Sequence, residues 1–369
     1  MSAELRDAPA AARDEELADF LVAARRAGLF AMTVPRRAGG VGAGLRAQVR
    51  VIAELGQECP STAWIAALSA ALKSVCSPLF PEEAREVLFA DPDAIVCGST
   101  TPLGARSEQT GYGFSISGRW QAAAGCEHSA WAVLAAPVHV KGQLIVPCPV
   151  LVSTRDLTVE RTGPTTGMAG TGTHTLVAQD VVVPTAHVVL PRTEADGEPD
   201  APVASTALLG MVVVMLAPLL GAARGARRAM EAGPAGGKSS SAAAGRRPAG
   251  SPLPRERLTA ADRLVDSATR RTLRVAGVLD ALGTSASLPS QEQTLLRAEL
   301  LAVAQECREA VEPLLDLHSA GGFAPDLLLR RFRNDVAVIT RHPQFDPHTV
   351  AEDYGRVLFG PGPGAVPML

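Results

Sequence analysis

The sequence has few aromatic residues and no closely spaced cysteines. Phe, Trp and Tyr make up 4% of the 369 residues, with three tryptophans among them. The six cysteines form no Cys-x-x-Cys pair and have no histidine at zinc-ligand spacing, which excludes the common structural zinc motifs. We therefore expect single buried thiols and no metal site.

The sequence also lacks an excess of either charge. It carries 35 Lys and Arg against 38 Asp and Glu, a formal net charge of -3. A protein that neutralises many phosphates needs a basic surplus, so no nucleic acid partner is expected. The segment Met1–Ala12 contains acidic side chains and no apolar signal-peptide core, and we expect a cytoplasmic protein.

One stretch, Ala201–Ala223, has no charged side chain and is long enough to cross a bilayer. It also contains Pro202, Gly210 and Pro218, and it continues into a helix-like segment that carries arginines. A helix buried in the centre of a bundle has the same hydropathy. We therefore expect a buried helix here and no membrane partner.

Three blocks of different periodicity follow one another along the chain. Helical spacing of apolar residues is followed by short β-branched runs between Gly and Pro turns, and helical spacing then returns. The second helical block includes an apolar stripe from Leu296 to Leu315. The expected fold class is α+β, mainly α. Its parts are an N-terminal helical domain over residues 1–94, a central antiparallel β domain over 95–198 and a C-terminal four-helix bundle over 199–369.

A segment rich in small residues, Ala232–Pro252, is expected to form a loop between bundle helices. Arginines gather in and after this loop. A solvent-exposed helix face would explain them. The more specific alternative is that they contact a phosphate group. They are Arg246, Arg247, Arg255, Arg257, Arg270 and Arg271.

Two segments of the central block suggest a pocket for a planar ligand. GRWQAAAGCEHSAW contains Trp120 and Trp131 on strands that flank a corner of small residues, although ordinary β packing explains them equally well. GPTTGMAGTGTHT combines glycines with threonine hydroxyls, which can hold a polar cofactor edge or a phosphate. A threonine-rich β turn is the alternative interpretation of the second segment.

His342 precedes Pro343, whose ring disfavours helical backbone at the residue before it. We therefore expect His342 at the end of the helix Leu328–Thr340, where its imidazole can point into a cleft. A capping or surface histidine is an equally good interpretation. The sequence shows no recognisable Ser/His/Asp or Cys/His arrangement.

Taken in order, these segments resemble the acyl-CoA dehydrogenase superfamily. Within it they are most similar to two-component flavin-dependent monooxygenases, such as the oxygenase component of 4-hydroxyphenylacetate 3-hydroxylase and the amino-sugar N-oxygenases. The resemblance covers about residues 14–360. It implies an acyl-CoA dehydrogenase-like fold, assembled as a homotetramer or homodimer, with a flavin between the β domain and the bundle. The matching segments include VPRRAGGVGAGL, CPSTAWIAAL, FPEEAREVLF, ISGRWQAAAGCEHSAWAVLAA, GMAGTGTHTLVAQDVVVP, GAARGARRAM and RRFRNDVAVITRHPQFDPHTVAEDYGRVLFG.

The resemblance further implies that a separate flavin reductase supplies reduced FMN or FAD. His342 would orient or deprotonate a phenol or amine while a flavin C4a-hydroperoxide delivers oxygen. No nicotinamide fingerprint is visible, which agrees with reduction elsewhere. The predicted function is a reduced-flavin-dependent monooxygenase acting on an aromatic or amine-bearing small molecule. The residues implied around the flavin are Ser99, Thr100, Trp120, Ala124, Gly125, Thr171, Gly172 and Thr173.

Two alternative functions stay open. A true acyl-CoA dehydrogenase needs a carboxylate base, and the position where the family carries it holds His342–Phe345, without a glutamate. A repurposed protein with a redox-neutral or non-catalytic role is suggested by departures from the family pattern. Leu72 replaces a common histidine and Ala124 a common serine, while Ala169 and Asn334 replace arginines.

Overall fold

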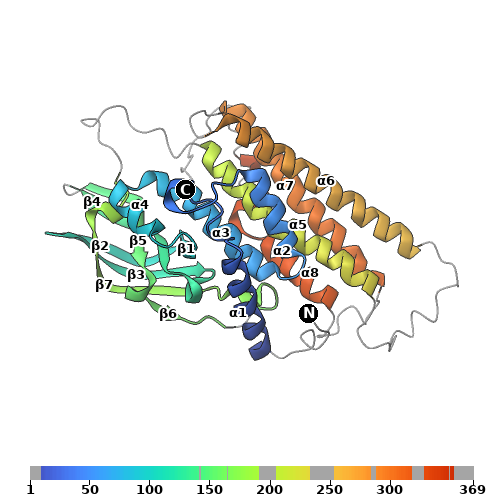
Figure 1. Ribbon diagram of the computed structural model, residues 1–369, viewed down its shortest axis with the longest axis horizontal. Helices are drawn as coiled ribbons and strands as arrows, with labels where there is room; N and C mark the ends of the chain where they lie inside the picture. Colours follow the sequence, from blue (N-terminus) through green and yellow to red (C-terminus); the bar gives the residue numbers. More distant parts are fainter. Residues whose placement is uncertain are drawn as a thin grey trace.

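The molecule consists of a β domain beside a larger array of helices (Figure 1). The computed structural model describes residues 10–140, 143–163, 165–190, 205–232, 253–283, 288–317, 328–348 and 350–352. The helical, β and helical order expected from the sequence is confirmed. The expected loop lies outside the described residues from 233 to 252.

From residue 10 onward, where the described structure begins, four α-helices precede the first strand. Backbone N–H groups at the start of the second helix donate to the Asp280 carboxylate, at 2.6 Å from Leu45 and 3.0 Å from Arg46. The third helix starts at Pro60, whose fixed φ suits the first helical position. These helices are α1 (Ala10–Arg26), α2 (Leu45–Gly56), α3 (Pro60–Cys76) and α4 (Glu82–Phe89).

Within the described residues, seven strands form two sheets, in the orders β1-β4-β5 and β2-β3-β7-β6. The strands are β1 (Val96–Ser99), β2 (Pro102–Thr110), β3 (Gly113–Ala123), β4 (Trp131–Val140), β5 (Gln143–Ser153), β6 (Thr158–Glu160) and β7 (His174–Pro184). The pairs β2–β3, β3–β7, β6–β7 and β4–β5 are antiparallel, as expected for the central domain, whereas β1 and β4 run parallel. The hairpin β2–β3 between them belongs to the other sheet, so the chain returns to the first sheet in the same direction.

In the described part of the chain, the C-terminal bundle consists of helices α5 (Ser205–Ala232), α6 (Leu253–Leu282), α7 (Ser290–Leu315) and α8 (Leu328–Ile339). Helix α5 packs against α2, α3, α6, α7 and α8. By length and composition, Pro60–Leu79 and Thr206–Met230 are apolar enough to cross a membrane, but 67% and 83% of their apolar windows are buried inside the molecule. The charge-free run is therefore the core helix of the bundle, and the expected apolar stripe of α7 is buried as well.

Helices α2 and α5 cross with their backbones in contact. A Cβ added to Gly221 would lie 2.4 Å from the Ala53 carbonyl oxygen, and one added to Gly56 would lie 3.0 Å from the Pro218 oxygen. Only glycine allows so close an approach at these two positions. The crossing fixes α2, and with it the start of α3, against the bundle.

Helix α3 lies between the bundle and the β domain (Figure 1) and packs against both α5 and β1. The Ser69 hydroxyl accepts a hydrogen bond from the Val96 N–H at 3.1 Å. Leu72 also faces β1, because a Cβ added to Gly98 would lie 3.0 Å from a Leu72 methyl carbon. Leucine at this departure from the family pattern therefore fills space against the first strand.

Candidate active site

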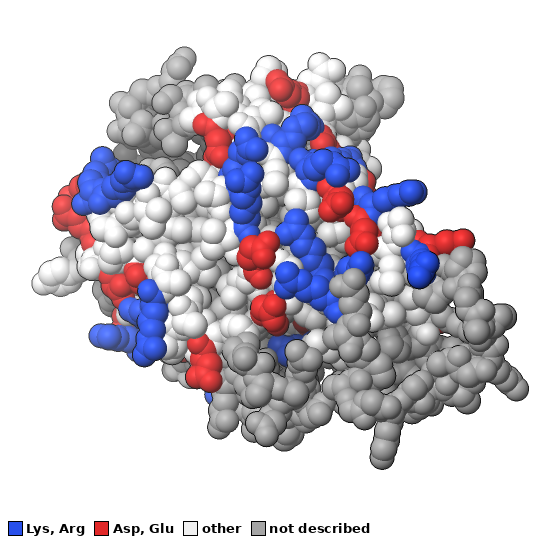
Figure 2. Space-filling model, turned by 45° about the vertical axis from the view of Figure 1, so that its right-hand side comes forward, with Lys and Arg blue, Asp and Glu red and all other residues white. Residues whose placement is uncertain are grey.

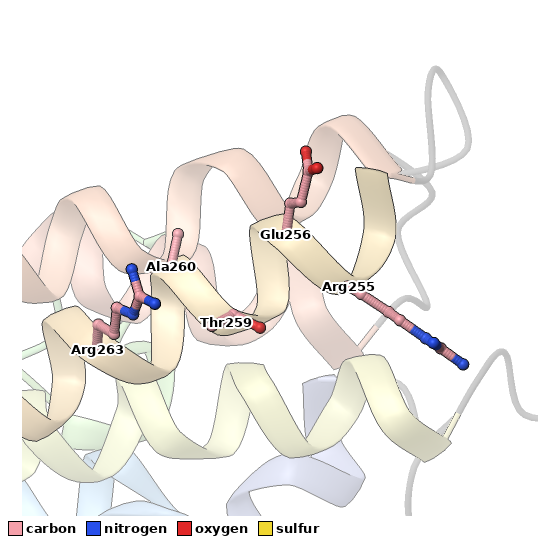
Figure 3. A pocket seen from close by; sticks show the side chains of 5 residues that line it. All are labelled: Arg255, Glu256, Thr259, Ala260 and Arg263. Atoms are coloured by element: carbon pink, nitrogen blue, oxygen red, sulfur yellow. The ribbon is translucent and has the colours of Figure 1, made fainter. Parts of the chain in front are cut away.

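The arginines of α6 form a solvated helix face. A hollow of about 340 Å³ on this helix is lined by Arg255, Glu256, Thr259, Ala260 and Arg263 (Figure 3). Arg257 pairs with Asp316, and Arg271 pairs with Glu299 and Glu306. Figure 2 shows basic and acidic side chains intermixed over this side of the molecule. The solvated-face interpretation therefore fits better than a phosphate contact.

The corner after β3 lies against α3. Gly125 adopts a left-handed φ of 76°, and a Cβ added there would lie 3.1 Å from Ile65. Ala124 is buried with the helical core. The Gly125 N–H donates to the Thr171 carbonyl oxygen at 2.7 Å. The structure thus joins the two segments that suggested a pocket.

The threonine-rich turn is held together by its own hydroxyls. Thr171 Oγ1 lies 2.7 Å from the Met168 carbonyl oxygen, to which it donates, and 2.7 Å from Thr173 Oγ1. Met168 and Gly172 both have a φ of 53°. The left-handed backbone at Met168 is uncommon for a residue with a side chain and needs support from its surroundings.

Helix α8 supplies that support. The Met168 N–H donates to Asp335 Oδ1 at 2.5 Å, and the Asn334 side-chain amide donates to the Thr166 carbonyl oxygen at 3.1 Å. A Cβ added to Gly167 would lie 2.3 Å from the Asn334 carbonyl oxygen. Two consecutive residues of α8 therefore tie the turn 166–171 to the bundle.

Ser99 and Thr100 stand at the end of β1. The Ser99 hydroxyl donates to the Gln121 carbonyl oxygen and accepts from the Thr101 N–H at 3.3 Å. Thr100, Gln121 and Ala122 are exposed. A strip of polar backbone and hydroxyl groups thus borders the corner at Ala122–Gly125.

Trp120 is not a wall of this site, which corrects the cofactor role implied for it. Its side chain is 0% exposed in the core between the two sheets. Its indole N–H donates to the Ala135 carbonyl oxygen at 2.7 Å. An indole ring that is enclosed on all sides and already hydrogen-bonded has no face left for a ligand. Ordinary β packing therefore explains Trp120.

His342 caps the short helix Pro343–Phe345 that follows α8. Its Nδ1 accepts the Gln344 N–H at 3.3 Å. Its ring centroid is 5.4 Å from that of Trp64 and 6.2 Å from that of Phe345, both edge-on. Burial lowers the pKa of His342 to about 4, so the imidazole is neutral near pH 7.

Trp64 is the residue that connects His342 to the corner, and sequence reasoning did not select it. Trp64 touches His342, and the next residue, Ile65, lies against Gly125. On α3 it looked like one more core position of an apolar helix. The available signal was its rarity, because the chain has three tryptophans.

A charged cluster next to Gly172 was also missed. Glu127 Oε2 lies 3.3 Å from His174 Nε2, and Glu127 Oε1 accepts from Arg161 Nε at 2.8 Å. Burial alone would raise the pKa of Glu127, but the hydrogen bond and charge of Arg161 outweigh it and lower that pKa. Glu127 therefore remains a carboxylate at the edge of the threonine-rich turn.

A small cavity of about 30 Å³ lies behind the same turn. Its lining includes Cys59, Arg331 and Asp335. That volume holds little more than a water molecule. Burial raises the pKa of the Cys59 thiol, so it is not an activated nucleophile. No group of three metal-ligating side chains occurs among the described residues.

The corner places hydroxyl-bearing residues beside small ones. The ring of a flavin needs hydrogen-bonding groups along its pyrimidine edge and room for a flat surface. Thr100 and Thr173 carry hydroxyls at this corner, whereas the Gln121 N–H and carbonyl oxygen are already hydrogen-bonded to Thr101 and Ser99.

Comparisons with known proteins agree with this arrangement. Residues 1–80 match the acyl-CoA dehydrogenase N-terminal domain and residues 213–347 match the acyl-CoA dehydrogenase C-terminal domain. The FADH(2)-dependent resorcinol hydroxylase oxygenase component of Rhizobium sp. is 38% identical over 170 residues. That alignment covers 45% of this chain and 41% of the relative, so less than half of each protein is compared.

Two further relatives align over nearly the whole chain. The flavin-dependent monooxygenase oxygenase subunit HsaA of Rhodococcus jostii is 25% identical and covers 93% of this chain and 91% of its own. The structure of XiaF from Streptomyces sp., in complex with FADH2 and glycerol, superposes with a TM-score of 0.79 at 28% identity. It covers 95% of this chain and 90% of its own. The relatives that it matches include oxygenase components of flavin-dependent monooxygenases, and the chain itself belongs to the acyl-CoA dehydrogenase superfamily.

Proposed function

We propose that this protein is the oxygenase component of a reduced-flavin-dependent monooxygenase that acts on an aromatic or amine-bearing small molecule. The observation that carries the proposal is the group at the end of α8. A neutral imidazole, His342, stands there against Trp64. Removal of a substrate α-proton, as in a dehydrogenase, needs a carboxylate of suitable pKa at that place.

Three segments would share the binding of the flavin. The corner Ala124–Gly125, the turn Thr171–Thr173 and the end of β1 at Ser99–Thr100 surround one side of α3. When bound, reduced FMN or FAD supplies the electrons that activate oxygen. The protein contributes positioning, and α8 does this twice, through Asp335 at the turn and through His342 at its end.

His342 would orient the substrate, with Trp64 and Phe345 excluding water from the imidazole. A separate flavin reductase would supply the reduced cofactor, which the words "oxygenase component" in the name of a relative support. A homotetramer or homodimer in the cytoplasm completes the proposal. The residue ranges 1–94, 95–198 and 199–369 remain the proposed domains.

Anaerobic titration with reduced FMN and reduced FAD tests this function directly. We expect saturable binding of at least one of them, followed on admission of oxygen by a hydroxylated product from a panel of phenols and aromatic amines. His342→Ala should lose product formation. His187→Gln is the matched control, because His187 lies in the β domain against Trp131. Failure of both reduced flavins to bind would contradict the proposal.

A redox-neutral or non-catalytic role is the second candidate, and one observation favours it. The Gly125 N–H and the Ser99 hydroxyl already donate to protein carbonyl groups. The same titration with reduced flavin distinguishes this candidate from the monooxygenase, because this candidate predicts no flavin-dependent product. An acyl-CoA dehydrogenase would instead show bleaching of bound oxidised flavin by an acyl-CoA.

A further inference from the structure

The Ser61 hydroxyl is buried and has no hydrogen-bond partner among the described residues. Ser61 is the second residue of α3, and it is 5% exposed. Other buried serines do have a protein partner. The Ser69 hydroxyl accepts from the Val96 N–H at 3.1 Å, and the Ser107 hydroxyl donates to the Pro137 carbonyl oxygen at 2.6 Å. Because a buried polar group without a hydrogen bond is costly, Ser61 needs a partner that is not part of the described protein.

Ser61 faces the small cavity behind the threonine-rich turn. A Cβ added to Gly170 would lie 3.3 Å from Ser61 Oγ and 3.6 Å from a Leu17 methyl carbon, and all three residues line the cavity. The cavity therefore takes up the place of the side chain that Gly170 lacks. Thr166 and Ala169 also line it, and both are exposed. They form its mouth, through which solvent can reach Ser61.

The charged groups of the cavity come from α8. Arg331 and Asp335 lie one helical turn apart and both line it. Asp335 Oδ1 accepts the Met168 N–H, but a carboxylate can accept several hydrogen bonds, and a guanidinium carries several N–H donors. An ion of either sign would meet a like charge here, whereas a neutral ligand would not.

We propose that this cavity binds one ordered water molecule, which bridges Ser61 of α3 to Arg331 and Asp335 of α8. The cavity volume of about 30 Å³ holds a water and excludes larger ligands. The water accepts from the guanidinium, donates to the carboxylate and shares a hydrogen bond with Ser61, and about three such bonds are typical of a buried water. It links the first helical block to the bundle beside the turn that Asp335 holds.

The sign of the stability change in Ser61→Ala tests this water. If the hydroxyl bonds to a water, its removal should lower the equilibrium constant of folding about two- to tenfold. If the hydroxyl had no partner, alanine would leave stability unchanged or raise it, since alanine is also the better helix former. Urea unfolding of the flavin-free full chain measures the change. Ser69→Ala is the matched control on the same helix, because it removes the bond to the Val96 N–H and should destabilise in either case.

Gly170→Ala fills the cavity from the opposite side. Its methyl group would lie 3.3 Å from Ser61 Oγ and displace the water. Ser61→Ala should therefore cost less stability in the Gly170→Ala background than in the unmodified protein, because the same water is already lost. Additive effects of the two substitutions would count against a shared water.

A crystal structure of the flavin-free full chain gives the direct observation. We expect one water within hydrogen-bond distance of Ser61 Oγ, and its loss in Gly170→Ala. A dry cavity, a direct bond from Arg331 to Ser61, or unchanged or raised stability in Ser61→Ala would overturn the proposal. None of these measurements uses flavin, so their failure is distinct from failure of the protein to bind reduced flavin.

Discussion

Two regions of the molecule each bury a tryptophan, and they use it differently. Trp120 lies inside the β domain, fully enclosed and bonded to the Ala135 carbonyl oxygen. Trp64 lies where α3 meets the end of α8, with its ring edge against His342. The first ring stabilises one domain, whereas the second stands between segments that are far apart in the sequence.

The difference shows how this fold separates stability from chemistry. The core around Trp120 is formed by strands of one domain and is closed to ligands. The junction around Trp64 belongs to α3, α8 and the corner at Gly125 together. The positions of residues at such a junction depend on elements that are far apart in the sequence. Substitutions there should therefore affect ligand binding more than they affect folding.

Replacing Trp120 with alanine should have the largest effect on stability. We expect the free energy of unfolding to fall by about 3–5 kcal/mol, because a large enclosed ring is lost and a cavity remains. Denaturant unfolding monitored by circular dichroism measures this. Flavin affinity of the folded fraction should be unchanged.

Trp64→Ala provides the contrast to that variant. It should raise the pKa of His342 from about 4 toward its ordinary 6.5, since water would reach the imidazole. If the pKa of His342 is unchanged in Trp64→Ala, the proposed distinction between the two tryptophans is wrong.

Acid should destabilise the junction through His342. Its pKa is about 4 in the folded protein and 6.5 when unfolded, so between these values the unfolded chain binds more protons. Stability is therefore lost as pH falls from 6.5 to 4, by up to about 3 kcal/mol at 1.36 kcal/mol per pKa unit. The free energy of unfolding should therefore change less with pH between 4 and 6.5 in His342→Gln than in the unmodified protein.

Breaking the link between α8 and the threonine-rich turn should have an intermediate effect. Asp335→Ala leaves the buried Met168 N–H without its acceptor, at a cost of about 1–3 kcal/mol. Flavin affinity should also fall, because Thr171 and Thr173 follow that turn. Asn334→Ala is the control, since its bond to Thr166 is solvent-exposed and should matter less.

Arg161→Ala should have the smallest effect. Its side chain is 78% exposed, and exposed ion pairs contribute about 0–1 kcal/mol. The pKa of Glu127 should rise when the guanidinium is removed, which a ¹³C carboxylate titration detects. A large loss of stability would show that the charged cluster supports the turn beyond its own pairing.

The sequence predicted the elements well wherever one face of an element is buried. The stripe from Leu296 to Leu315 and the charge-free run before Arg224 became core helices, as their periodicity indicated. It did not predict the parallel pairing of β1 with β4. Strand direction depends on which sheet the intervening hairpin joins, and that choice is made by long-range packing.

The candidate site was also predicted only in part, because local composition selects segments but does not show which side chains they contact. The segments at Gly125 and Thr171 were selected from their composition, and the structure joins them by a backbone hydrogen bond. Trp120 and Trp64 could not be distinguished from sequence. Both are rare and large, and only their contacts in the folded protein distinguish them.

By itself, the sequence determined the order of helical and β blocks, the buried helix α5 and the place of His342 after α8, because these follow from local periodicity and from Pro343. Tertiary structure alone decided which tryptophan meets His342 and which residues of α8 hold the turn at Met168. Local preferences act between neighbours in the chain. Contacts across a junction depend on how whole elements pack, and no single segment encodes them.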